Sequence, residues 1–447
     1  MIEFRRPLAL AALVLCLSAC GRGDAPDSVH LRLQAVADPV EARAYRELID
    51  AFRTERPDVE VEFVPVGRHA EHVTRLTTSF AAGNAPDLFL INFRRWGQFI
   101  ASDVLEPVGP LLRDAGLFER EAFYEPPLDG FTYGGELICM PQNVSSLVVY
   151  WNRALFKQYG VEPPAPDWTW KEFHDAARAL TRDLDGDRRA DLYGLDVDPS
   201  IIRLAPFVWQ AGGRIVDDIH APTRFALRST QAVTGLMFLK RLKNEVGVIP
   251  PLIERRAEGP DARFIRGGAA MTLNSRRFSA GLRAVDGLDW DVAPLPRHRE
   301  AASVLHADAY CLGRQSRHKA AARDFIAFAT GETGQALLSA SGRIVPVRKS
   351  VAESEAFLDP DQPPASARVF LDTIPTLRRT PNIPTWYEIE TRINPVIEEW
   401  MFESAAQMAG EANFGLRDGY LLVDLIEQAA GGLLKPAPAG GKTENDS

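Results

Sequence analysis

The sequence predicts an α/β protein with doubly wound sheets, and three observations carry this prediction. Strand, helix, strand, helix and strand patterns follow one another within residues 29–91, as in parallel sheets covered by helices. Residues 88–91 form a short, wholly apolar run, which is typical of a strand buried on both faces. The chain has 447 residues, 46% of them apolar, so it can fill a large core or two lobes.

Each element of this first segment follows from the spacing of its apolar residues. Residues 29–33 and 59–63 alternate apolar and polar side chains, which is the pattern of a strand. Apolar residues recur at helical spacing over 45–52 and again over 73–80. Gly83 follows the second of these segments, at a position where glycine commonly ends a helix.

The later part of the chain is mainly helical, and this change indicates a second lobe. Thr169 and Glu172 fit a capping box that opens a helix over 170–180. We further expect helices over 207–213, 233–242, 321–330, 393–402 and 421–426, and strands over 264–273 and 289–296. Residues 435–447 are rich in proline, glycine and polar side chains, and we expect them to be disordered.

Charge and composition exclude several classes of protein. The formal net charge is −9, which argues against a nucleic-acid partner, because phosphate binding needs a dense basic face. No apolar run approaches the ~20 residues of a membrane span, so we expect neither a channel nor a permease.

The first 19 residues resemble an export signal, because two arginines precede a short apolar stretch over 8–17. The motif Leu17-Ser18-Ala19-Cys20 resembles the lipobox of bacterial lipoproteins, in which the cysteine is acylated and the signal is cleaved just before it. The resemblance implies a lipid anchor on Cys20 and a polar tether over 20–28. The alternative is an ordinary signal peptide with a chance cysteine.

Cys139 and Cys311 each lie in an apolar, strand-like run. In an oxidising compartment they could pair as a disulfide. We favour the other interpretation, in which both are small buried hydrophobic side chains.

Motifs of common enzymes are absent, so we expect a protein that is not an enzyme. The sequence has no G-x-S-x-G and no G-x-G-x-x-G. Gly441-Lys442-Thr443 lacks the upstream glycine of a phosphate-binding loop, where Pro436 stands instead. His69-Ala70-Glu71-His72 is not H-E-x-x-H, and we interpret it as a helix surface.

One acidic loop resembles a calcium site. It places aspartates at positions 1, 3, 5 and 9, and calcium prefers several oxygen ligands in a tight turn. Against a calcium site, position 6 is arginine rather than glycine and position 12 is glycine rather than glutamate. The alternative is a solvated polar turn, and we expect no cofactor besides structural calcium. The candidate ligands are Asp183, Asp185, Asp187 and Asp191.

The order of several short motifs is similar to that of the extracellular solute-binding proteins, family 1, of ABC transporters, the maltose-binding type. The motifs are Asn84-Ala85-Pro86-Asp87, Gly134-Gly135-Glu136-Leu137, Val149-Tyr150-Trp151-Asn152, Trp209-Gln210-Ala211-Gly212-Gly213, Gly267-Gly268-Ala269-Ala270-Met271 and Ala293-Pro294-Leu295-Pro296. The resemblance runs over residues 29–434.

The resemblance implies a type II fold of two α/β lobes with a ligand cleft between them. One lobe would contain 29–140 and 302–355, and the other 141–301 and 356–434. It implies a monomeric receptor that captures a carbohydrate and delivers it to the permease subunits of an importer. Such a receptor would be exported and anchored to the cell membrane, facing the periplasm or the exterior.

Candidate binding residues follow the predicted strands, because doubly wound folds bind ligands at the ends of their strands. The resemblance implies that Asn92, Arg94 and Arg95 bind sugar hydroxyls and that Trp96 stacks on the sugar; the alternative is a surface arginine pair and a core tryptophan. Further candidates in the first lobe or at its boundary are Asn143, Ser145 and Asp308.

The second lobe contributes arginines where the family usually has a tryptophan. Arg276, Arg277 and Phe278 follow an apolar strand, and with Arg94 and Arg95 they could make a basic cleft. An anionic ligand, such as a sugar phosphate or a glycerophosphodiester, is therefore the alternative to a neutral sugar, with an exported glycoside-active enzyme as a further alternative. Trp209, Trp386 and Tyr387 are candidate aromatic contacts, the last two by resemblance to the family's sugar platform; the alternative for these two is that they anchor the core at the start of a helix.

Overall fold

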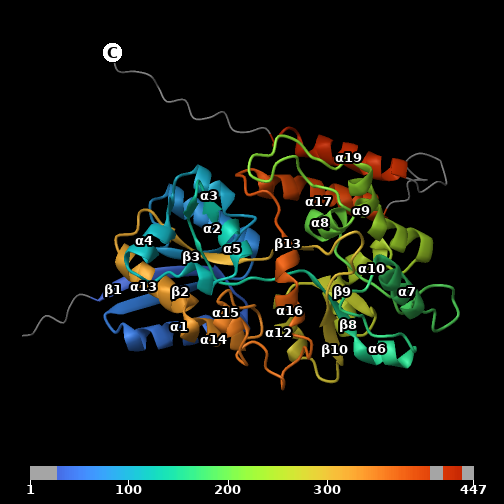
Figure 1. Cartoon of the computed structure of the whole chain (residues 1–447), viewed down its shortest axis with the longest axis horizontal. Helices are drawn as coiled ribbons and strands as arrows, with labels where there is room; N and C mark the ends of the chain where they lie inside the picture. The colour runs from blue at the N-terminus through green and yellow to red at the C-terminus, as the bar shows by residue number, and fades with distance from the viewer. Residues whose placement is uncertain (1–27, 403–415, 435–447) are drawn as a thin grey trace, which may run out of the picture.

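The computed structural model describes residues 28–402 and 416–434, which form two lobes joined by crossing segments (Figure 1). The expected signal sequence, Cys20, most of the tether and the expected disordered tail lie outside these residues.

The first lobe is built on a six-stranded sheet in the order β2-β1-β3-β12-β4, with β7 beside β12. β1 pairs in parallel with β2 and with β3, whereas β12 pairs antiparallel with β3. The sheet therefore confirms the predicted parallel β-α-β start. Its strands are β1 (Val29–Val36), β2 (Val59–Val66), β3 (Leu88–Asn92), β4 (Leu105–Glu106), β7 (Met140–Pro141) and β12 (Asp308–Gly313).

Helices cover both faces of this sheet. α1 begins with a capping box, in which the Asp38 carboxylate accepts from the backbone N–H of Glu41 and the Glu41 carboxylate accepts from the backbone N–H of Asp38. Its buried face includes Leu48 and Phe52, as the spacing predicts. The helices of this lobe are α1 (Pro39–Glu55), α2 (His69–Ala81), α3 (Gly97–Ala101), α4 (Val108–Asp114), α5 (Glu125–Gly130), α13 (Lys319–Thr330), α14 (Glu332–Ala340) and α15 (Lys349–Ala352).

The second lobe holds a three-stranded antiparallel sheet in the order β10-β8-β9 and a larger helical part. Its strands are β8 (Val148–Asn152), β9 (Met271–Asn274) and β10 (Trp290–Ala293). Its helices are α6 (Arg153–Gln158), α7 (Trp170–Leu180), α8 (Ile201–Gln210), α9 (Thr230–Arg241), α10 (Leu252–Ala257), α11 (Pro260–Ile265), α12 (Arg277–Arg283), α17 (Trp386–Phe402) and α19 (Leu416–Ala430).

The strand expected over 264–273 is wrong in its first half. Pro260 opens helix α11 instead, because proline at the first helical turn needs no N–H partner. Gly267, at φ +80°, then reverses the chain, and β9 begins only at Met271.

Crossing segments join the lobes near the middle of the molecule. β11 (Ser303–Val304) pairs in parallel with β13 (Leu377–Arg378), and α16 (Val369–Asp372) lies beside them (Figure 1). Phe370 packs in a core that contains residues of both lobes, among them Leu305 and Tyr150. The expected boundary between residues 140 and 141 falls inside β7.

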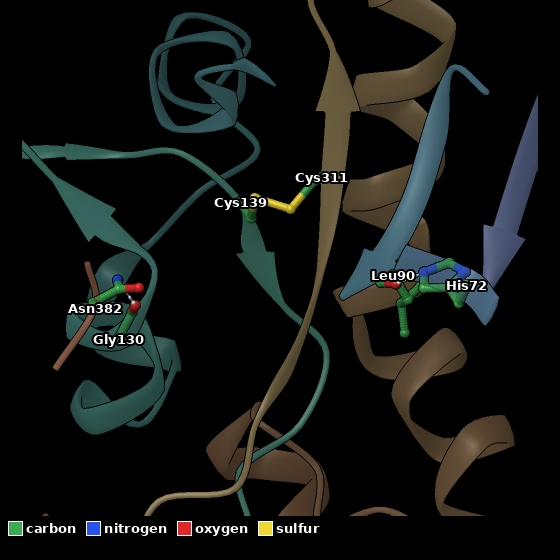
Figure 2. Close-up of a disulfide and its surroundings, with 6 residues drawn as sticks. All are labelled: His72, Leu90, Gly130, Cys139, Cys311 and Asn382. Atoms are coloured by element: carbon green, nitrogen blue, oxygen red, sulfur yellow. Dashed lines mark hydrogen bonds between the residues drawn. A yellow bond between two sulfur atoms is a disulfide. The ribbon is translucent and has the colours of Figure 1, made fainter. Parts of the chain in front are cut away.

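Cys139 and Cys311 form a disulfide, so our interpretation as unpaired cysteines is wrong (Figure 2). The antiparallel pairing of β7 with β12 sets Tyr310 opposite Met140, which brings the two cysteines to a Cα–Cα distance of 4.5 Å. A separation of 172 residues conceals this contact in the sequence.

Candidate ligand-binding site

A polar cavity of about 200 Å³ lies between the two lobes. It forms where the carboxyl ends of β1 and β3 meet the amino end of the antiparallel β12, so three strands deliver side chains to one edge. The second lobe closes the cavity with Ser275 and Arg277. The predicted residues that line it are Asn92, Arg94, Arg95, Asn143, Ser145, Arg277 and Asp308.

Asp308 is the central acceptor of this cavity. Its carboxylate accepts hydrogen bonds from Asn92 Nδ2 at 3.2 Å and from Asn143 Nδ2 at 3.4 Å. Its backbone N–H donates to Asn143 Oδ1 at 3.2 Å. Two amides therefore hold the carboxylate in place, and together they offer a ligand donors and acceptors in a fixed arrangement.

Three arginines reach across from one lobe to the other. Arg94 forms an ion pair with Glu390 of α17 at 2.7 Å, and Arg277 forms one with Glu41 of α1 at 2.7 Å. The Arg95 guanidinium lies over the Tyr387 ring at 5.0 Å. The two lobes therefore contact each other around the cavity.

Three histidines, His69, His72 and His306, line the cavity in their neutral form at pH 7. Burial lowers the pKa of His306 to about 3, with Arg94 and Arg203 contributing. Burial also lowers the pKa of His69 to about 4, and Arg95 adds to this effect.

His72 corrects our interpretation of residues 69–72 as a helix surface. Its side chain is buried, its Nε2–H donates to the carbonyl of Leu90 at 2.7 Å, and its Nδ1 accepts from Gln34 (Figure 2). Burial lowers its pKa to about 4. The α2 helix thus presents imidazoles to the sheet edge, where the periodicity alone predicted solvent.

The aromatic candidates do not form an exposed platform. Trp96 is fully buried and packs against Phe131 at 5.4 Å, and Trp386 is fully buried with its Nε1–H donating to Glu390 at 2.7 Å. Both rings fill hydrophobic cores, so the stacking roles expected for them are wrong in this conformation. Phe278 packs edge-on against Tyr150 at 5.1 Å and does not line the cavity.

Arg276 and Trp209 also lie outside the cavity. The Arg276 guanidinium is buried over Phe357 at 4.9 Å and Phe370 at 5.4 Å, and burial lowers its pKa to about 9. Trp209 lines a second and wider space, a groove of about 940 Å³ between α5 and the 209–220 segment, which we name the reverse groove.

The reverse groove and the polar cavity lie on opposite sides of a crossing segment. Leu305 lines the groove and its neighbour His306 lines the cavity, as side chains alternate in extended backbone. Asn382 ties the second crossing segment to α5, because its Nδ2 donates to the carbonyl of Gly130 at 2.9 Å (Figure 2).

A comparison with known protein families identifies the family of this chain. A family model described as a bacterial extracellular solute-binding protein matches residues 37–336. The chain belongs to this family. The predicted family and the predicted two-lobed α/β fold are both confirmed.

Solved structures share the fold of this solute-binding protein. An ABC substrate-binding protein from Listeria monocytogenes, in complex with cycloalternan, has a TM-score of 0.79 and 21% identity over 91% of this chain and 100% of that one. UgpB from Mycobacterium tuberculosis, in complex with glycerophosphocholine, has a TM-score of 0.74 and 22% identity over 90% of this chain and 98% of that one.

Curated relatives are somewhat more similar in sequence, and several of them match only part of the chain. The sn-glycerol-3-phosphate-binding periplasmic protein UgpB of Pectobacterium atrosepticum is 30% identical over 136 residues, which cover 30% of this chain and 31% of that relative. A putative binding protein of Brucella abortus is 24% identical over 85% of this chain and 90% of the relative. The solute-binding protein thus spans 31–41% of the length of the first curated relatives it matches.

Glu41 and Arg343 are cavity residues of this solute-binding protein that the sequence did not indicate. Glu41 follows the end of β1 and lies in the α1 capping box, so a search of all strand ends would have found it. Arg343 lies in no motif, whereas His306 immediately precedes the predicted strand that begins at Asp308, and both line the cavity. Arg343 pairs with Asp38 at 2.6 Å and with Glu41 at 3.0 Å.

The acidic loop brings three of its four candidate calcium ligands together. One carboxylate oxygen from each of Asp183, Asp185 and Asp187 lies within 4.8 Å of the others, and all three side chains are exposed. Asp191 is not part of this group, and its Oδ2 accepts from the backbone N–H of Leu184 at 2.6 Å. Calcium binding in this loop stays a prediction.

Proposed function

We propose that this solute-binding protein is the capture component of an ABC importer for a compact carbohydrate or carbohydrate derivative. The polar cavity between the lobes carries the proposal, because side chains of both lobes meet there. A ligand in that position would bind both lobes and stabilise their closure, which is how a two-lobed receptor encloses its solute.

The chemistry of the cavity supports a polyhydroxylated ligand. Asp308 with its two amide partners, Asn92 and Asn143, offers acceptors and donors side by side, as sugar hydroxyls require. A volume of about 200 Å³ is below the ~300 Å³ at which drug-sized pockets begin, which favours a small ligand in this conformation. Two structural neighbours, described above, bind cycloalternan and glycerophosphocholine.

We propose that the protein binds its ligand without catalysing a reaction. The cavity's own carboxylates are Glu41 and Asp308, and each is already engaged, Glu41 by Arg277 and Arg343 and Asp308 by amides. An unengaged pair of carboxylates, which glycoside hydrolysis needs, is missing from the cavity lining in the described residues.

We also propose that the protein is exported, acts as a monomer and is anchored through an acylated Cys20 to the membrane that holds its permease. No helix within residues 28–402 and 416–434 is both long and apolar enough to span a membrane. Cys20→Ala would then release the protein into the soluble fraction, and lipid labelling that persists in this variant would contradict the anchor.

Small-angle X-ray scattering on the soluble Cys20→Ala protein tests the capture function. Lobes that close on a ligand give a smaller radius of gyration, and the same ligand raises the melting temperature by linkage. The panel contains neutral sugars, sugar acids and sugar phosphates. A panel in which no compound changes either quantity would contradict a carbohydrate receptor.

A further inference from the structure

Arg277 of the second lobe contacts two helices of the first lobe at the same time. Its Nη2 donates to Glu41 Oε2 of α1 at 2.7 Å, and its Nη1 donates to His69 Nε2 of α2 at 3.3 Å. We name Arg277, Glu41 and His69 the interlobe clamp. Because both of its contacts cross the boundary between the lobes, they are lost when the lobes separate.

The first lobe holds the Glu41 side of the clamp in place. Glu41 Oε1 pairs with Arg343 at 3.0 Å, and Arg343 also pairs with Asp38, which caps α1. An arginine therefore lies beside each oxygen of Glu41. This carboxylate is already compensated, so it offers little stabilisation to a further positive charge on His69.

The geometry of the clamp requires His69 to be neutral. A guanidinium has N–H donors and no acceptor, so the ring nitrogen that Arg277 contacts must accept the hydrogen bond. His69 Nε2 therefore carries no proton in this arrangement. A proton on Nε2 would remove the acceptor and set two cations side by side, so that an attraction between the lobes would become a repulsion.

The other charged groups around His69 mostly favour the same neutral form. Burial is the main cause that lowers the pKa of His69 to about 4, and Arg95, Arg277 and His72 add to it. Asp308 of β12 acts in the opposite direction. When the lobes separate, Arg277 leaves and water reaches the ring, so the pKa returns toward its ordinary value of 6.5.

We propose that the interlobe clamp is an acid-sensitive latch, which holds the lobes together while His69 is neutral and releases them once His69 is protonated. The inference rests on the proposed capture function, because it assigns a regulation to the closure of the same cavity. Arg277 and His69 act here as positioning residues, which set the arrangement of the lobes. The protein retains its solute at neutral pH and releases it more readily in an acidic medium.

The direction of the effect follows from the difference in proton affinity between the two arrangements. The separated lobes bind the proton of His69 more tightly, so acid favours separation. Between pH 6.5 and 4 the ratio of closed to separated molecules falls by up to about tenfold per pH unit. From pH 7.5 to pH 5.0 we expect a fall of about 10–30-fold.

Small-angle X-ray scattering on the ligand-free, soluble Cys20→Ala protein at pH 7.5 and pH 5.0 tests the latch without any solute. We expect a larger radius of gyration at pH 5.0. The far-UV circular dichroism spectrum should be the same at both pH values, because the lobes separate and stay folded. A radius of gyration that does not increase at pH 5.0 overturns the proposal.

Two substitutions in the clamp test the role of its residues. In His69→Gln, the side-chain oxygen accepts from Arg277 but does not titrate, so the radius of gyration should stay small at both pH values. Arg277→Gln removes the cation that crosses between the lobes, so the radius should be large already at pH 7.5 and should not respond to acid. A variant that keeps the full pH response overturns the proposal, and Arg277→Gln supplies this test if His69→Gln does not fold.

His220→Gln is the matched control. His220 Nδ1 also accepts from an arginine, Arg379, at 3.1 Å, but His220 is exposed and lies in the reverse groove. This variant should keep the pH response of the unsubstituted protein, and a loss of that response would overturn the assignment to His69.

The outcomes separate the latch from the proposed function, because the scattering measurements use no ligand. A radius of gyration that does not respond to pH overturns the latch and leaves the capture function standing. A ligand panel without a binder contradicts the capture function and leaves the pH response of the lobes unchanged.

Discussion

The polar cavity and the reverse groove lie on opposite sides of one crossing segment, yet they satisfy their charges in different ways. In the groove, Asp217 accepts hydrogen bonds from Thr223 in its own loop, which hold the pKa of Asp217 below its usual value. In the cavity, Arg94 and Arg277 find their carboxylates on the other lobe. The groove is the larger space, but its Asp217 has its partner within one loop, whereas the cavity arginines pair across the two lobes.

The larger volume of the reverse groove therefore does not make it the better candidate for the ligand-binding site of this protein. A carboxylate that is already satisfied within its own loop, such as Asp217, gains little when a ligand enters the groove. The ion pairs of the cavity connect the two lobes, so they break when the lobes separate. Binding of a ligand in the cavity is therefore coupled to the closure of the lobes.

Glu390→Gln should cause the largest change. The substitution leaves Arg94 at the lobe interface without its carboxylate, which costs about 3–5 kcal/mol when a buried pair is broken. Because the cost falls on the closed arrangement, ligand affinity should drop at least about tenfold and the radius of gyration should increase. Calorimetry and small-angle scattering measure the two effects.

Glu300→Gln is the matched control, because its partner Arg378 lines the reverse groove. It breaks the Glu300–Arg378 pair at 2.6 Å, whose side chains are about 40% exposed, so it should cost no more than ~1 kcal/mol and leave ligand affinity unchanged. Equal losses of ligand affinity in Glu390→Gln and Glu300→Gln would contradict the difference between the cavity and the groove.

Asp308→Ala should have the next largest effect. It removes the acceptor that Asn92 and Asn143 hold in place, and a hydrogen bond to a charged group contributes about 1.5–3 kcal/mol. Affinity should fall about 10–100-fold, as measured by calorimetry. Asp217→Ala in the groove serves as the control and should leave affinity unchanged; an unchanged affinity in Asp308→Ala would place the ligand elsewhere.

Acidification should destabilise the cavity side of the molecule. Burial depresses the folded-state pKa of His306 to about 3 and of His69 and His72 to about 4, against an ordinary value of 6.5. The unfolded chain therefore binds more protons between these values, so stability is lost as pH falls from about 6.5 toward 4. Each histidine contributes up to ~1.4 kcal/mol per pH unit.

Denaturant unfolding at a series of pH values measures this slope. His306→Gln should flatten it, whereas His220→Gln should leave it unchanged, because His220 lies exposed in the reverse groove. A slope that His306→Gln does not alter would show that other groups cause the acid sensitivity.

The sequence predicted the strand-end residues of the site better than its aromatic residues. Asn92, Arg94 and Arg95 follow a wholly apolar strand, and the position of a strand end is a local property that periodicity reveals. Whether a tryptophan faces a cleft or a core depends on distant partners, such as Phe131 for Trp96, which no local pattern contains.

The same physical limit explains the other differences. The disulfide joins residues 172 apart, and the Glu41–Arg277 pair joins two lobes. Both arise from tertiary contacts that a single sequence, taken alone, cannot reveal. The parallel sheet of the first lobe was predictable because consecutive strands of a β-α-β unit are neighbours in space.

Calcium should have the smallest effect, because the acidic loop lines neither the cavity nor the groove. If Asp183, Asp185 and Asp187 bind the ion, millimolar calcium should raise the melting temperature by about 1–2 °C through linkage. Asp185→Asn should abolish that shift and leave ligand affinity unchanged, since Asp185 contacts only its own loop in the described structure. Differential scanning calorimetry in calcium and in EDTA measures the shift. The absence of any difference would identify the loop as a solvated turn, and a change in ligand affinity would show that charges outside both spaces also govern closure.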